Sequence, residues 1–196
     1  MADNIAQLLK KNHYELASIQ RNSSIWFETQ AFKLLDVNGV EAKSALQGDA
    51  RKLKTTFDLG SMYFFLYDAK HKDKLPYYDM FPLVLPFSVT KNGFVGLNLH
   101  YLPYDMRIRL LSKLQEFRTS NSLTPQSKLR FQWETLQSVA RGKGTKACVK
   151  QYLGDHVGSP FRLVPPDDWA TACMLPLERF SGSDKFQVWS DSLRKL

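Results

Sequence analysis

Residues 75–90 read LPYYDMFPLVLPFSVT and are followed by Lys91, Asn92, Gly93 and the apolar run FVGLNLHYL. An Asn-Gly pair between two apolar runs is the strongest short-range signal for a β-hairpin, because both residues accept the positive φ angles of a tight turn. The segment therefore predicts two antiparallel strands joined by this turn. Its two tyrosines and its acid also raise three possibilities, which are an active site, a recognition surface or a tightly specified core.

Two prolines complicate the first strand of that hairpin. Pro82 and Pro86 have no N–H to donate to a neighbouring strand, so proline is confined to sheet edges, strand starts and bulges. We therefore expect this arm to be an edge strand, or to enter the sheet only near Leu85.

A helix is expected directly after Pro103. Apolar residues recur at helical spacing between residues 104 and 117, while Arg107, Arg109 and Lys113 fall on other faces of the same segment. The apolar positions are Met106, Leu110, Leu111, Leu114 and Phe117.

The remaining segments predict both helices and strands. Residues 4–35 read as two helices and residues 61–68 as a strand. Further elements are expected as a helix from Pro125, a short helix at about 146–153, a strand near 160–164 and a helix start before Trp169. We therefore expect an α+β fold with N-terminal helices, a small antiparallel β-sheet or partly open barrel at about 57–103, and C-terminal helices packed on it. The expected division is an N-terminal helical arm, 1–56, and a single α+β domain, 57–196.

The composition describes a folded chain. Of 196 residues, 43% are hydrophobic and 13% aromatic, far above the level of disordered chains. No stretch resembles a membrane span or a signal peptide, so we expect a protein used inside a cell or a particle, without a membrane partner. Cys148 and Cys173 are the only cysteines, and with four scattered histidines they indicate buried thiols, with neither a disulfide framework nor a zinc site.

Positive charge is concentrated in one part of the chain. Residues 107–150 hold ten Lys or Arg against two Glu, a net charge of +8 that equals the excess of the whole chain. Such clustering suits a polyanion, because each cation that neutralises a phosphate releases a counterion. The alternatives are a solvated face or a face that meets an acidic protein. The candidate DNA-binding residues are Arg107, Arg109, Lys113, Arg141, Lys143 and Lys146.

No catalytic or cofactor motif is recognisable. In RGKGTK, Gly144 follows Lys143 where a nucleotide-binding phosphate loop needs Ser or Thr. Asp68, Asp73 and Asp79 are close in sequence, as in a metal-dependent nuclease, yet no further carboxylate pattern accompanies them. His100 lies within an expected strand and reads as a hydrogen-bonded structural histidine. We therefore expect no catalytic residue, no metal ligand and no cofactor, and keep a nuclease only as a remote alternative.

Three long motifs carry a resemblance to a known family. They are SMYFFLYDAKHKDKLPYYDMFPLVLPF at 61–87, GFVGLNLHYLP at 93–103, and WATACMLPLERF at 169–180 with VWSDS at 188–192. Residues 57–196 resemble virion proteins of large contractile-tailed bacteriophages that act as DNA end protectors, whereas the first 56 residues match nothing recognisable. The resemblance implies a minor structural protein without catalysis.

The same resemblance implies when and where such a protein acts. It would join the particle late in head maturation, bind the packaged end of double-stranded DNA and shield that end from host exonuclease after injection. Its partners would include virion proteins of the head, neck or tail, and its locations the host cytoplasm during assembly and then the virion. An assembly component of the neck, tail or baseplate that binds acidic subunits without touching DNA remains open beside this hypothesis.

Overall fold

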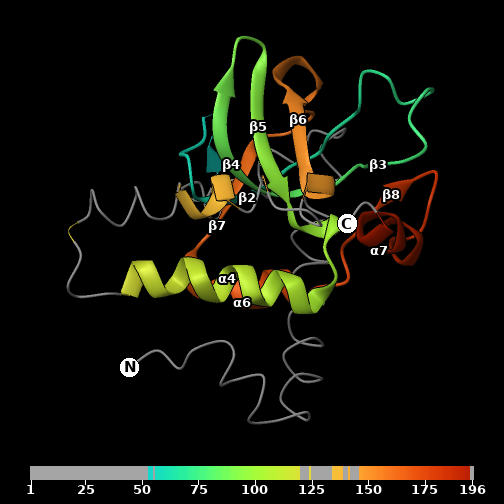
Figure 1. The fold of residues 1–196 in the computed structure, drawn as a ribbon. Helices are drawn as coiled ribbons and strands as arrows, with labels where there is room; N and C mark the ends of the chain where they lie inside the picture. Colours follow the sequence, from blue (N-terminus) through green and yellow to red (C-terminus); the bar gives the residue numbers. More distant parts are fainter. Residues whose placement is uncertain are drawn as a thin grey trace.

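The computed structural model describes residues 53–54, 56–119, 124, 134–138, 141 and 146–194. Within this part, six strands form one antiparallel sheet in the order β1-β7-β2-β4-β5-β6 (Figure 1). The strands are β1 (Leu53–Lys54), β2 (Met62–Phe64), β4 (Leu83–Thr90), β5 (Gly93–Asn98), β6 (Val149–Leu153) and β7 (Phe161–Val164). The expected α+β class is confirmed for these residues, while the expected N-terminal helices lie outside them.

The expected hairpin is confirmed, but its turn consists of Lys91 and Asn92, because Gly93 already pairs with Thr90, and Asn92 does not adopt a positive φ. Strands β4 and β5 pair from Val84 with Asn98 to Thr90 with Gly93, and the ladder shifts register between Pro86 and Ser88. The edge-strand alternative is wrong, because β4 lies between β2 and β5. The other alternative, entry into the sheet only near Leu85, is close to the observed start of β4 at Leu83.

Pro86 is tolerated inside the sheet for a local reason. Strand β2 pairs with β4 only at Leu83 and Val84, so the next part of β4 has no strand on that side. The Pro86 carbonyl accepts a hydrogen bond from Gly60 N, which marks the side of β4 that Pro86 faces. Because N and O of one strand residue point the same way, the missing N–H costs no bond to β5.

The C-terminal part of the chain completes the sheet. The strand near 160–164 is confirmed as β7, which lies between β1 and β2, and β6 covers the outer edge of β5. The helix predicted at 146–153 is wrong, since only the 3-10 helix Lys146–Cys148 precedes β6. The range 57–103 was therefore too narrow for the sheet, and β1, which falls within 1–56, pairs with β7.

Helices cover one face of the sheet. In Figure 1, α4 (Tyr104–Thr119) runs across the lower end of the sheet with α6 (Trp169–Met174) behind it, and α7 (Lys185–Arg194) lies to one side. Buried leucines of α4, as expected, join Trp169 and the inward side chains of β2, β4 and β5 in the main core. These leucines are Leu110, Leu111 and Leu114. A separate pair of short strands, β3 (Tyr78–Asp79) and β8 (Phe180–Ser181), stands beside the sheet. No helix within the described ranges is long and apolar enough to cross a membrane.

Aromatic side chains fill the other face of the sheet. Along β2, Met62 and Phe64 enter the main core, whereas Tyr63 and Phe65 enter a second cluster, as the two-residue period of a strand requires. Phe94 and Tyr152 of neighbouring strands stack in that cluster, with ring centroids 5.2 Å apart. Because both faces are covered, every residue from 62 to 65 is buried.

Gly93 gives a test of the β4–β5–β6 register. A Cβ at Gly93 would collide with the backbone carbonyl of Tyr152, which cannot rotate away. We expect Gly93→Ala to lower the free energy of unfolding by about 1–3 kcal/mol, measured by urea denaturation. Gly154→Ala is the control, because its Cβ would meet only Asn92 O at 3.7 Å and should change stability by less than about 0.5 kcal/mol. Equal losses in the two variants would contradict this register.

Candidate nucleic-acid interface

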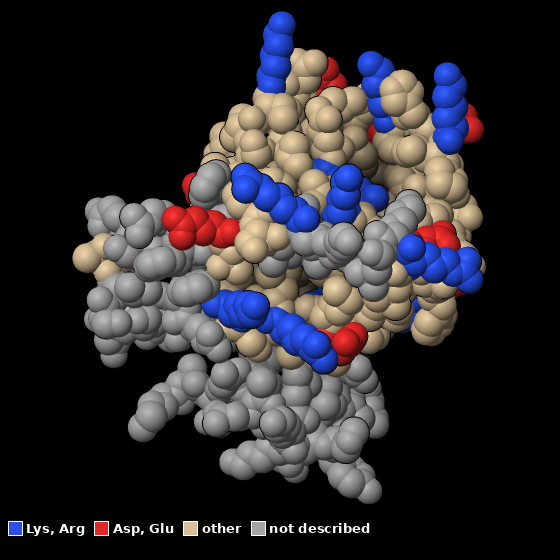
Figure 2. Space-filling view, viewed as in Figure 1, with Lys and Arg blue, Asp and Glu red and all other residues tan. Residues whose placement is uncertain are grey.

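Two of the candidate contacts share the outer face of α4. Arg109 and Lys113 are exposed and lie four residues apart, so their side chains project from the same side of the helix. Figure 2 shows basic side chains along the position of α4. No ion pair joins either of them to another residue of the described part. Within the described part of the chain, both side chains therefore stand exposed on the outer face of α4.

Arg107 lies inside the protein, which corrects its assignment as a DNA contact. Its side chain is 0% exposed, and Nη2 stands 2.6 Å from Glu178 Oε1. Arg107 Nε donates to Leu102 O at 2.7 Å, and the two terminal nitrogens donate to Cys173 O and His100 O at 3.1 and 3.2 Å. The sequence carried the signal, because Arg107 precedes Leu110, Leu111 and Leu114 at helical spacing and so belongs to the inward stripe.

Two other candidate cations lie outside α4. Arg141 and Lys146 are exposed, and Lys146 begins a 3-10 helix that packs near α7 and the 3-10 helix Leu99–Tyr101. Lys143 lies outside the described residues. Among the described candidates, the only pair that the structure places on one element face is therefore Arg109 and Lys113.

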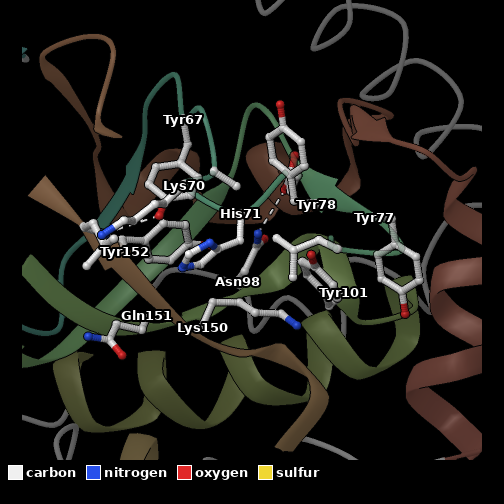
Figure 3. Close-up of a pocket in the computed structure, with 14 residues that line it drawn as sticks. Tyr67, Lys70, His71, Tyr77, Tyr78, Asn98, Tyr101, Lys150, Gln151 and Tyr152 are labelled. Atoms are coloured by element: carbon white, nitrogen blue, oxygen red, sulfur yellow. Dashed lines mark hydrogen bonds between the residues drawn. The ribbon is translucent and has the colours of Figure 1, made fainter. Parts of the chain in front are cut away.

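A pocket that the sequence did not indicate lies between the segment 67–79 and the β5–β6 edge (Figure 3). Its volume is about 390 Å³, and its lining is rich in tyrosine. The tyrosines of the lining are Tyr67, Tyr77, Tyr78, Tyr101 and Tyr152. Lys70, His71 and Lys150 add cationic or titratable nitrogen atoms to the same lining.

Asp79 and Asn98 belong to this lining and are held by a buried hydrogen-bond network. The Asp79 carboxylate accepts from Phe81 N at 3.0 Å and Asn98 Nδ2 at 3.0 Å, and its Oδ2 is 2.8 Å from His100 Nδ1. Asn98 Oδ1 in turn accepts from His100 N. The side chains of Asp79 and His100 are each 1% exposed, so this part of the pocket is fixed by the fold.

Burial also sets the chemistry of the tyrosines and cysteines. Desolvation raises the pKa of Tyr101 and of Tyr152 well above the usual range, so both side chains stay neutral phenols. Burial likewise raises the pKa of Cys148 and Cys173 to about 12 each, as expected of packing thiols. Neither cysteine therefore has the thiolate character of a nucleophile.

A family model described as phage T4 terminal DNA protecting protein matches residues 6–192. The chain belongs to this family. No curated protein and no solved structure matches the chain.

Membership in the terminal DNA protecting family confirms the resemblance and widens it. The match begins at residue 6, so the view that the first 56 residues match nothing is corrected. The motifs at 61–87, 93–103 and 169–180 with 188–192 supply most of β2 to β5, α6 and part of α7. They contain the hydrogen-bond and ion-pair partners of Arg107 and most of the pocket lining. The motifs are thus the framework of the fold, and Arg109 and Lys113 lie on the helix that follows the second motif.

A stability measurement distinguishes the two roles on α4. Arg107→Ala removes one partner of a buried ion pair and leaves the Glu178 carboxylate with only Lys185 Nζ, at 3.8 Å, so we expect a loss of about 3–5 kcal/mol in the free energy of unfolding. Arg109→Ala, two residues away and exposed, should change it by less than about 0.5 kcal/mol. Urea denaturation of both variants tests this, and an unaffected Arg107→Ala variant would show that the arginine is not buried as described.

Proposed function

We propose that this protein is a non-enzymatic component of the phage particle that binds the end of double-stranded DNA. The family match supports this proposal, because the family is described as protecting terminal DNA. A protein that guards an end of any sequence needs contacts to phosphates, which position a protein without reading bases. Exposed Arg and Lys side chains supply such contacts.

The observation that carries the proposal is the pair of exposed cations on α4. Neighbouring positions on a helix face hold Cβ atoms about 5–6 Å apart, and the long side chains of Arg109 and Lys113 can reach adjacent phosphates of one strand. Arg141 and Lys146 are exposed and extend the set of candidate contacts, together with Lys143. Arg107 contributes only by holding α4 in place.

The proposed function also indicates the stage of assembly at which the protein joins the particle. The last end of a packaged DNA molecule exists only when packaging stops, so a protein that caps it joins late. We place the protein in the host cytoplasm until then and afterwards in the virion, next to head, neck or tail proteins.

An apolar groove supports the second hypothesis, that the protein is an assembly component that docks on other virion proteins. Phe186 of α7 is 68% exposed and Met80 is 38% exposed, and both line a groove that also includes Phe180. Exposed aromatic and methionine side chains are enriched at protein interfaces. This role is compatible with DNA binding through α4.

The described residues give little support to the nuclease alternative. Three hydrogen-bond partners hold the Asp79 carboxylate, and within the described part no group of three His, Cys, Asp or Glu side chains could hold a metal ion.

Binding of a linear duplex across a salt series tests the proposal. Each neutralised phosphate contributes about 0.9 to the slope of log K against log salt, so Arg109→Ala combined with Lys113→Ala should reduce the slope by about 2. Lys91→Ala combined with Arg194→Ala removes two exposed charges elsewhere and is the matched control, for which we expect a much smaller change in slope.

Two results would contradict the proposal. Absence of binding to any DNA at low salt would leave only the assembly role. An equal effect of the control pair would show that binding follows total charge and not the face of α4.

A further inference from the structure

We propose that the pocket between the segment 67–79 and the β5–β6 edge holds one unpaired nucleotide at the end of a DNA strand. The inference rests on the proposed function and adds to it the means by which an end is distinguished from the interior of a duplex. Phosphate contacts alone cannot make that distinction, because every nucleotide of a duplex presents the same phosphates.

The size of the pocket suits a single nucleotide. Its volume of about 390 Å³ falls at the lower end of the range of roughly 300–1,000 Å³ that small-molecule sites occupy. A duplex could not enter a pocket of this volume, whereas one base with its sugar could.

Tyrosine rings form two walls of the pocket. In Figure 3, Tyr67 and Tyr152 lie on one side and Tyr77 and Tyr101 on the other. The rings of Tyr67 and Tyr152 contact edge to face at 4.9 Å, which fixes their orientation. Tyr67 and Tyr77 are half-buried and so present ring surface to a ligand, whereas Tyr101 and Tyr152 are buried and support them from behind. Aromatic side chains stack on any base, since every base has a π-face, and this suits an end of arbitrary sequence.

Only an unpaired base can enter the pocket. A paired base is held within the duplex by its partner strand, and the pocket is too small for a base pair. An unpaired base is found where a strand ends or frays. Asp79 belongs to the lining, but its side chain is 1% exposed and is held by three hydrogen-bond partners, so it supports the pocket from within the protein.

Cations at the pocket match the phosphate of such a nucleotide. Lys70 and His71 are exposed, and Lys150 is half-buried with its Nζ 3.9 Å from the centroid of the Tyr101 ring. Of the two exposed acids in this segment, Asp68 and Asp73, Asp68 is paired with Lys72 at 2.9 Å, which offsets its charge. The base would enter between the tyrosine rings while its phosphate stays near Lys70.

The test compares three DNAs of equal length with the full chain. They are a duplex with one unpaired nucleotide at each end, a blunt duplex, and a duplex closed by hairpin loops of flexible non-nucleotide linkers, which has no ends. We expect fluorescence anisotropy to give about tenfold tighter binding for the unpaired-end duplex than for the closed one, with the blunt duplex between them because its terminal pairs fray.

Variants in the segment 67–79 test whether the preference for unpaired ends depends on the pocket. Lys70→Ala should reduce the preference for unpaired ends at least threefold, and Tyr67→Ala, which removes a stacking wall, about tenfold. Lys74→Ala is the matched control, because Lys74 is an exposed lysine of the same loop outside the pocket lining and should keep the preference. Thermal unfolding establishes that each variant is folded.

The outcomes separate the two proposals. Equal affinity for the unpaired-end and closed duplexes, or a preference that survives in both Lys70→Ala and Tyr67→Ala, would overturn the pocket assignment while leaving phosphate binding by α4 intact. If the protein binds none of the three DNAs, the proposed function itself is overturned.

Discussion

The buried guanidinium of Arg107 is the interaction on which the rest of the fold depends. Removing a charged group from water costs free energy. Here one carboxylate and three backbone carbonyls interact with the Arg107 guanidinium and offset that cost. The acceptors come from the end of α6, the segment after it and the turn that follows β5. Arg107 thereby joins the helical layer to the sheet at the point where β5 ends.

The same junction positions the pocket. The carbonyl of His100 accepts from both Arg107 and Trp189 of α7, while its ring lies against Asp79. Glu178, the partner of Arg107, stands two residues before β8, which pairs with β3 and so holds Asp79. Helices, hairpin and pocket therefore share one continuous polar network, and the family motifs fall on the segments that build it.

Sequence patterns predicted the elements whose signals are local. The hairpin of β4 and β5 and the helix beginning at Tyr104 needed only neighbouring residues, and both are confirmed. Strand β6 was missed because Val149–Leu153 is a strand only through pairing with β5, a partner more than fifty positions away. Pro86 was misjudged for a similar reason, since its tolerance depends on where β2 stops.

The candidate site was predicted in the same uneven way. The charge pattern identified Arg109 and Lys113 as exposed cations, but it also included Arg107, which is buried. The burial of Arg107 was not predicted, because its partner Glu178 is 71 positions away in the sequence. The pocket brings together residues from three separate segments, and only its tyrosine-rich part was visible in the sequence. The segment 75–90 is thus both framework and pocket wall, with its acid held by the network.

The central claim is that this protein protects a DNA end, and an exonuclease assay tests it most directly. A linear duplex saturated with the protein would be treated with an exonuclease that starts at ends, and in parallel with a restriction enzyme that cuts at an interior site. We predict that end digestion slows at least tenfold while interior cutting keeps its rate. Digestion of the saturated duplex at the rate of free DNA, or equal slowing of both enzymes, would contradict the account.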